Sequence, residues 1–339
     1  MTQSRVADGP PSEPMGGPDA RGVGTASSFW PALAAGWALL SAAGWLYARS
    51  KGIPGSVAIP VLAAFLVEYP FYLLPAFIEL RERFARGLPL FLVLSFIAPY
   101  VIYATNTGQF RWRALVQLAA LGTVLGLWYR ILPAVPLADG AFLLLVAAVV
   151  LRGYFDPIYT SPAPGLHLEI LGHVALTRVC AMVMLVDRRV TGIGYGFIPS
   201  LEDLRAGLRH FVYFLIAAIP LVWITRLLRL GPGMPLWRVA AIFFGVLWVV
   251  ALSEEFFFRG LLQQWMVGWT GSQNRALLGT SILFGAVHLG FRGFPNWRFA
   301  LLAAVAGWFY GRAFRQARSI RASMMTHALV VTLWRAIFV

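Results

Sequence analysis

The sequence predicts an all-α fold, a polytopic bundle of transmembrane helices, from its composition, the length of its apolar runs and the position of its charges. The chain has 339 residues, of which 59% are hydrophobic and 12% charged, and its mean hydropathy is +0.71. Soluble domains carry about 25% charged residues, so these apolar side chains require a bilayer as well as a protein core. At ~20 residues per span, the apolar runs predict roughly 8 to 11 membrane helices.

Residues 1–28 precede the first apolar run and are rich in Gly, Pro, Ser and Asp. Such a segment buries too little apolar surface to fold, and we expect a disordered N-terminal tail. It lacks the ordered basic, apolar and cleavage regions of a secretory signal peptide. The first apolar run, Phe29–Ala48, is therefore expected to act as an uncleaved signal anchor.

The remaining apolar runs follow at short intervals. They are Ser56–Ile78, Leu88–Ala104, Ala114–Leu132, Gly140–Leu151, Leu166–Val186, Phe211–Leu228, Leu236–Phe258, Ala276–Leu289, Phe299–Phe314 and Ala322–Val339. Two of them, Gly140–Leu151 and Ala276–Leu289, are shorter than a full span. We expect these two to tilt, to re-enter the membrane or to extend into neighbouring residues.

The longest internal polar stretch, Asp187–His210, divides the chain into two membrane regions. Its charged residues recur at helical spacing, which is typical of an interfacial amphipathic segment. Residues 29–210 form helices to which the sequence assigns no role. Residues 211–339 concentrate the side chains capable of chemistry and are expected to form the catalytic bundle.

The net charge of +14 comes almost entirely from arginines in the connectors between apolar runs. This distribution is typical of membrane-flanking charge and not of a nucleic-acid groove. Membrane lipids, and not nucleic acid, are therefore the expected partners of the basic residues. The single cysteine, Cys180, excludes an intrachain disulfide and a cysteine metal site.

The strongest functional signal lies in residues 253–259, Ser-Glu-Glu-Phe-Phe-Phe-Arg, at the end of an apolar run. A charge at bilayer depth costs roughly 2.5–3.5 kcal/mol even on the lenient insertion scale. Glu255 and Arg259 are four residues apart, so they share a helix face and can pair. Glu254 points elsewhere and is free to act as a general base. The alternative is a solvated charge cluster at a helix end.

Two later apolar segments each carry one histidine. His288 ends the run Phe-Gly-Ala-Val-His, in which Phe284 lies on the same helix face. His327 lies near the start of the last segment. Taken alone, each fits an interfacial or core histidine, but together with Glu254 three apolar helices offer acid–base groups to a shared interior.

Other motifs favour structural interpretations or are absent. His167, Glu169 and His173 follow two prolines and fit a polar helix start, and His210 lies in a basic connector. The chain contains neither the His-Glu-x-x-His of zinc proteases nor the Gly-x-Ser-x-Gly of serine hydrolases.

The order Glu254-Glu255-x-x-x-Arg259, then Phe284-x-x-x-His288, then His327 in a final helix resembles the CAAX protease and bacteriocin-processing (CPBP, or ABI) family, in particular the type II CAAX prenyl endopeptidases. The resemblance covers roughly Leu236 to Val339. It implies a multi-pass hydrolase of the cell membrane that cuts a membrane-associated peptide or protein substrate.

The resemblance also implies roles for the site residues. Glu254 activates a water molecule, and His288 helps to position or deprotonate it. His327 donates toward the developing oxyanion. Glu255, Arg259 and Phe284 support the site.

The use of a metal is left open by the sequence. Glu254, His288 and His327 are a ligand set that suits a catalytic zinc ion with one open position. The same residues suffice for a mechanism in which glutamate activates a water molecule without a metal. We favour this mechanism because the sequence identifies no residue that would hydrogen-bond to the metal-binding side chains and orient them.

One position departs from the family pattern, which usually has asparagine four residues after the last histidine. Here that residue is Val331. Because of this departure, the alternative to a protease is a catalytically impaired relative of the family. Such a relative would bind peptides or lipoproteins, for example in self-immunity. A proton-relay transporter is a third class, but the sequence has no paired repeats with broken helices to favour it.

Overall fold

The structure is a computed structural model that describes residues 24–227, 231 and 233–337. Every regular element in these residues is helical, and no strand occurs among them. The predicted all-α membrane fold is confirmed. The expected disordered tail lies almost wholly outside the described residues, and α1 begins at Ala26.

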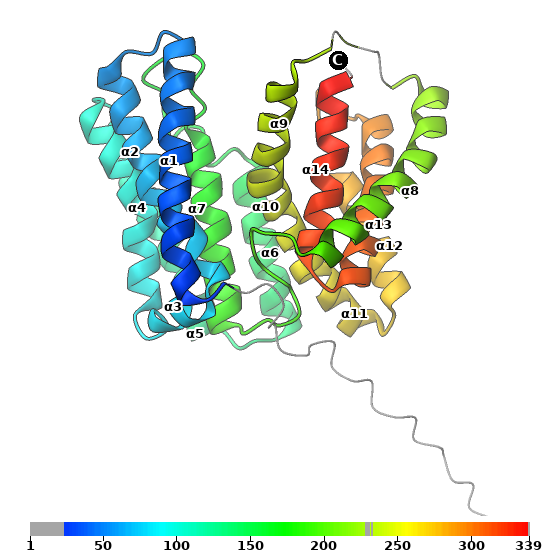
Figure 1. Cartoon of the computed structure of the whole chain (residues 1–339). Coiled ribbons are helices and arrows are strands. Elements are labelled where there is room, and N and C mark those ends of the chain that lie inside the picture. The colour runs from blue at the N-terminus through cyan, green and yellow to red at the C-terminus, as the bar shows by residue number, and fades with distance from the viewer. Residues whose placement is uncertain (1–23, 228–230, 232, 338–339) are drawn as a thin grey trace, which may run out of the picture.

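The helices form two bundles that stand side by side (Figure 1). The N-terminal bundle contains α1 (Ala26–Ser50), α2 (Gly55–Leu73), α3 (Ile78–Arg83), α4 (Leu88–Asn106), α5 (Trp112–Ile131), α6 (Pro136–Leu151) and α7 (Glu169–Met182), which continues as the π-helical η2 (Val183–Asp187). The C-terminal bundle contains α8 (Leu201–Thr225), α9 (Leu236–Gly245), α10 (Leu252–Glu255), α11 (Gln264–Thr270), α12 (Gln273–Val287), α13 (Trp297–Ala317) and α14 (Ile320–Ile337).

Seven helices within the described residues are long and apolar enough to cross a membrane. They are α1, α2, α4, α5, α7 with η2, α8, and one continuous helix from Leu236 to Thr270 that includes α9, α10 and α11. This number is below the expected range of spans. Four of the expected runs are not among them. Helices α6 and α12 have only 16 and 15 residues, while α13 and α14 are made less apolar by charged residues such as Arg312 and Arg321.

Helix α8 begins earlier than the apolar run predicted. Residues 201–210, expected as part of a polar connector, form its first turns, so the expected boundary at residue 210 falls inside a helix. Ser200 caps the helix in a reciprocal pair with Asp203. Asp203 is buried and also pairs with Arg321 of α14 at 3.1 Å, which fixes the start of α8 against the last helix.

The N-terminal bundle packs directly against the long helix of the C-terminal bundle. Val246, Leu252 and Phe256 belong to the same buried apolar cluster as the interiors of α4 and α7. The Tyr72 hydroxyl donates to the Trp248 carbonyl at 2.7 Å. The first bundle therefore holds the segment on which the two adjacent glutamates lie.

Candidate active site

The two adjacent glutamates lie on a short α-helical turn between two wider π-helical stretches. Here α10 (Leu252–Glu255) is preceded by η3 (Val246–Ala251) and followed by η4 (Phe256–Gln263). π-Helical turns are rare and occur frequently at functional sites. In this helix they set the direction in which the two carboxylates leave the backbone.

Glu255 and Arg259 form the buried ion pair that their spacing predicts. The Arg259 Nε lies 3.1 Å from Glu255 Oε2, and neither side chain has any exposed surface. Arg259 Nη2 also donates to the Gly307 carbonyl at 2.8 Å. Its guanidinium stacks over Phe284, with its central carbon 4.6 Å from the ring centroid. Burial of this charge is therefore matched by a carboxylate, a carbonyl and an aromatic face.

His327 reaches both glutamates from α14. Its Nδ1 is hydrogen-bonded to Glu255 Oε1 at 2.7 Å, and its Nε2 lies 4.0 Å from Glu254 Oε2. A carboxylate only accepts, so Nδ1 carries a proton and Nε2 faces the interior. The sequence did not reveal that Glu255 holds His327 as well as Arg259, because the two residues are 72 positions apart.

Glu254 differs from its neighbour in having a partly open environment. Its side chain is 31% exposed, whereas that of Glu255 is fully buried. The Oε2 atom of Glu254 is itself buried and has no hydrogen-bond partner within the described part of the chain. The carboxylate therefore keeps an acceptor position that is directed toward His327 and is available to a water molecule or a substrate.

His288 caps the end of α12 and presents one nitrogen to the same region. Its Nδ1 lies 2.7 Å from the Phe284 carbonyl, which can only accept, so Nδ1 is the protonated nitrogen. The ring also packs against Phe284 and Phe299, with centroid distances of 4.7 and 5.7 Å. In the neutral histidine Nε2 is then an acceptor, as a general base requires.

Tyr310 of α13 is a site residue that the sequence did not reveal. Its ring stacks on His327 with a centroid distance of 4.7 Å and an interplanar angle of 15°. The side chain is almost fully buried, yet it lines the cavity described next. Tyr310 lies three positions after Gly307, whose carbonyl accepts a hydrogen bond from Arg259, so the two residues share a face of α13.

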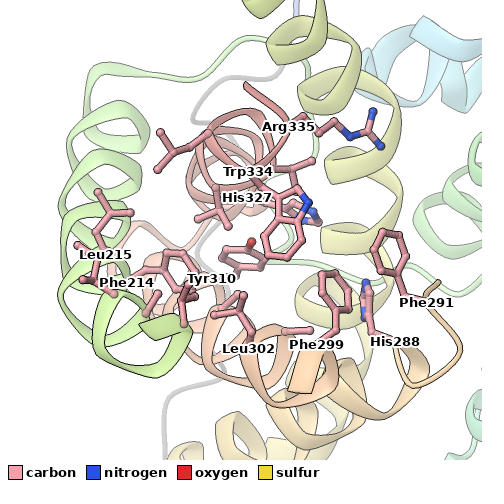
Figure 2. A pocket seen from close by; sticks show the side chains of 18 of the residues that line it. Phe214, Leu215, His288, Phe291, Phe299, Leu302, Tyr310, His327, Trp334 and Arg335 are labelled. Atoms are coloured by element: carbon pink, nitrogen blue, oxygen red, sulfur yellow. The ribbon is translucent and has the colours of Figure 1, made fainter. Parts of the chain in front are cut away.

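Glu254, His288, Tyr310 and His327 line one cavity of about 1220 Å³. Figure 2 shows three of these residues around the space, with Phe214 and Leu215 of α8 on the opposite side. Most of the lining is apolar and comes from α8, α13 and α14. The structure thus brings together all three of the polar residues proposed for catalysis.

Val331 lies on the wall of this cavity, one helical turn beyond His327. Its side chain supplies no hydrogen-bond donor where the family pattern has an amide. The Thr332 hydroxyl is buried and has no partner within residues 24–227, 231 and 233–337, and Thr332 is not among the cavity residues. Trp334 lines the cavity one further turn along α14.

The cavity contains three side chains of the types that bind metal ions, Glu254, His288 and His327. In the described part of the chain, no group of three or more His, Cys, Asp and Glu side chains is positioned to hold a metal ion. One nitrogen of His327 is bound by Glu255, and one nitrogen of His288 by a carbonyl. These bonds leave Nε2 of each histidine unbound, and they are of the kind that metal-binding histidines commonly make through their other nitrogen, so the choice between a zinc ion and a metal-free water stays a prediction.

The other histidines lie outside the cavity. His167 is exposed and pairs with Glu169 at 3.0 Å, and His173 bonds the Glu169 carbonyl at 2.9 Å. Both lie at the start of α7, as the structural interpretation predicts. His210 lies 3.1 Å from Gln316 and is buried within α8, not in a connector.

Comparison with known families agrees with this geometry. Residues 235–333 match the model of the family described as "Type II CAAX prenyl endopeptidase Rce1-like". The matched part of the C-terminal bundle is similar to this family of membrane endopeptidases. The match covers α9 to α13 and most of α14, and it includes Glu254, His288, Tyr310 and His327. No curated protein and no solved structure gives a significant match to the chain.

Proposed function

We propose that the protein is an intramembrane endopeptidase that hydrolyses a peptide bond in or beside the membrane. The observation that carries this proposal is the unpartnered Glu254 Oε2, 4.0 Å from His327 Nε2, inside a largely apolar cavity. A carboxylate with a free acceptor position beside an imidazole is what activation of a water molecule requires. The family match of residues 235–333 to membrane endopeptidases supports the same class of reaction.

In this proposal Glu254 removes a proton from a water molecule, and His288 Nε2 orients that water by accepting its other hydrogen. The water oxygen forms a bond to the carbonyl carbon of the substrate, and the carbonyl oxygen becomes an oxyanion. The C–N bond then breaks, and the proton held by Glu254 moves to the leaving amine. The products are a carboxylic acid and an amine.

His327 stabilises the oxyanion. Glu255 accepts a hydrogen bond from its Nδ1–H at 2.7 Å and fixes the ring so that Nε2, which must carry a proton in this step, faces Glu254 and the cavity. Arg259 keeps Glu255 in place at 3.1 Å. Fixed donors of this kind in a site that excludes water are worth more than they are in solvent.

Tyr310 supplies the second donor in place of the side chain that Val331 lacks. Its ring is fixed against His327, and the residue lines the cavity. In this proposal its hydroxyl donates to a substrate oxygen. Removing one oxyanion donor costs about 10²–10³ in kcat, so an enzyme with Val331 at this position requires such a replacement.

The substrate in this proposal is a membrane-associated peptide or protein, and the enzyme is a multi-pass protein of the cell membrane. The apolar cavity wall suits a peptide segment that enters from the lipid phase. Membrane lipids surround the helices, and the proposal includes no nucleic-acid partner. The mechanism has no metal step, and elemental analysis of the purified protein for zinc checks this point.

The test is peptide cleavage by the full chain in proteoliposomes, with prenylated and unmodified membrane peptides as substrates. We expect Glu254→Gln to lower kcat by about 10²–10⁴, the contribution of a general base, without a change in unfolding temperature. Glu169→Gln, at the start of α7, is the matched control and should keep wild-type activity. Equal cleavage by the wild type and Glu254→Gln contradicts the proposal.

Val331 favours one alternative, a relative that binds membrane peptides without cutting them. In that case the folded wild type binds the peptides with the same affinity as Glu254→Gln and yields no product by mass spectrometry. Product formation that depends on Glu254 eliminates this alternative.

A further inference from the structure

His288 lies at the point where α12 ends. The helix runs to Val287, and the bond between His288 Nδ1 and the Phe284 carbonyl lies within its last turn. Helix ends fray, and a contact inside the last turn moves with that turn. The direction in which His288 Nε2 points therefore depends on the segment that follows the helix.

Asn296 closes that segment, residues 289–295, onto the start of α13. Its backbone amide donates to the Leu289 carbonyl at 2.8 Å, and its side-chain Nδ2 donates to the Phe291 carbonyl at 2.9 Å. Its Oδ1 accepts from the Phe299 amide at 3.2 Å, because Asn296 is the N-cap of α13. A carbonyl only accepts and a backbone amide donates, so these contacts are compatible with one orientation of the side-chain amide.

The residues that Asn296 holds are those that pack around the His288 ring. Phe291 stacks on Phe299 with a centroid distance of 4.3 Å, and Phe299 packs against His288 at 5.7 Å. The Phe291 amide also donates to the His288 carbonyl at 3.0 Å. Figure 2 shows the three rings together at one edge of the cavity, which all three residues line. Asn296 is not among the cavity residues.

We propose that Asn296 is a positioning residue, whose side-chain amide holds the Phe291 carbonyl and thereby fixes His288 Nε2 where it orients the attacking water. This inference rests on the proposed function and extends it to a residue outside the cavity. The orientation of a group relative to the reacting atoms sets the rate, and a displacement of about 1 Å costs about 10²-fold.

The N-cap of a helix also has a structural role, and the two roles of Asn296 use different atoms. The cap uses Oδ1, whereas the connector is held by Nδ2. Asp and Ser are about as good as Asn at an N-cap, but neither carries the Nδ2 donor. Asn296→Asp and Asn296→Ser therefore remove the positioning contact and keep the cap.

The first experiment measures peptide cleavage by the full chain in proteoliposomes. Asn296→Asp and Asn296→Ser should each lower kcat about 10- to 100-fold, with KM unchanged and an unfolding temperature close to that of the wild type. If both variants keep wild-type kcat, the proposal is wrong.

Ser272→Ala is the matched control for loss of a cap. The Ser272 side chain accepts from the Arg275 amide at the start of α12, at the opposite end of that helix from His288. This variant should lower the unfolding temperature and keep wild-type kcat per folded molecule. If Ser272→Ala lowers kcat as much as Asn296→Asp does, the loss reflects helix stability and not the position of His288.

A double variant tests whether Asn296 acts through His288. Because His288→Ala removes the ring, Asn296→Asp should cause no further loss of kcat in that background. A residue that only stabilises the bundle would lower kcat by the same factor with and without His288. Equal factors in the two backgrounds therefore overturn the positioning role.

Solid-state NMR of isotope-labelled histidine rings in the same vesicles provides a measurement independent of cleavage. The His288 signal, identified by its loss in His288→Ala, should show one tautomer with Nδ1 protonated, as the bond to the Phe284 carbonyl requires. We expect Asn296→Asp to mix in the second tautomer and Ser272→Ala to leave the signal unchanged. An unchanged signal in Asn296→Asp contradicts the proposal. If the signal changes but the wild type cleaves no peptide, the proposed function is wrong and the placement of His288 by Asn296 is retained.

Discussion

Glu68–Arg178 of the N-terminal bundle and Glu255–Arg259 of the C-terminal bundle are both buried carboxylate–guanidinium pairs, and they differ in what surrounds them. In the N-terminal bundle, Arg178 Nε lies 2.8 Å from Glu68 Oε1, and its Nη1 donates to the Ser95 hydroxyl at 2.8 Å. In the C-terminal bundle, Glu255 pairs with Arg259 and also holds His327. Both pairs are essentially without exposed surface.

Burial of charge therefore does not by itself mark the active site. The first pair has no second carboxylate next to it in the chain, and neither of its members lines the cavity. The second is adjacent to Glu254, whose free oxygen faces the cavity. A buried ion pair becomes part of a reactive site when it orients a titratable side chain toward a space that a substrate can enter.

The largest expected effect separates the two pairs directly. Glu68→Gln and Glu255→Gln each leave a buried arginine without its carboxylate, which costs about 3–5 kcal/mol of stability. Both variants should unfold at lower temperature in detergent. Glu255→Gln should also lower kcat by about 10²–10³, because His327 loses the carboxylate that fixes its ring toward the cavity.

The control for this comparison is activity per folded molecule below the unfolding temperature. Glu68→Gln should retain wild-type kcat under these conditions. If both variants lose activity equally, the N-terminal pair contributes to catalysis and the distinction between the bundles is wrong.

A smaller effect is expected for the tyrosine that stacks on His327. Tyr310→Phe removes only the hydroxyl and should lower kcat by about 10²–10³ with KM unchanged, as for loss of an oxyanion donor. Tyr159→Phe is the matched control, since that buried hydroxyl also lacks a hydrogen-bond partner in the described structure but lies in the N-terminal bundle. If kcat is unchanged in Tyr310→Phe, the hydroxyl does not act as an oxyanion donor and the tyrosine contributes only through the packing of its ring.

The position that departs from the family pattern allows a gain of activity. Val331→Asn places an amide on the cavity wall one turn from His327 and should raise kcat at least about tenfold, part of the ~2.7–4 kcal/mol that a good donor supplies. Val331→Ala controls for the change in volume. If Tyr310 already fills this role, the gain should be larger in the Tyr310→Phe background, and an absence of gain in both backgrounds rejects the role of this position.

The smallest effect concerns the contact that joins the two bundles. The hydroxyls of Thr177, next to Arg178, and Ser253, next to Glu254, are hydrogen-bonded at 3.0 Å. Thr177→Val should cost about 1 kcal/mol of stability and shift kcat by less than about tenfold. Thr123→Val, whose hydroxyl bonds only within its own helix among the described contacts, is the control, and an equal loss there would remove the special role of the contact.

The sequence by itself determined the membrane fold and the pairing within one helix. Hydropathy predicts the spans because a bilayer leaves unpaired backbone groups no other partner. The four-residue spacing of Glu255 and Arg259 predicts their ion pair, because helix geometry alone brings such residues together. Glu254, His288 and His327 also stood out, since ionisable residues in apolar helices are costly.

Tertiary structure decided every relationship between helices. Glu68 and Arg178 are separated by 110 residues. Each is a lone charge in its own apolar run, and the sequence does not indicate that the two form an ion pair. The bond from Glu255 to His327 and the stacking of Tyr310 on His327 depend on how α10, α13 and α14 pack. Periodicity fixes which face of a helix a residue occupies, but only packing fixes which other helix that face meets.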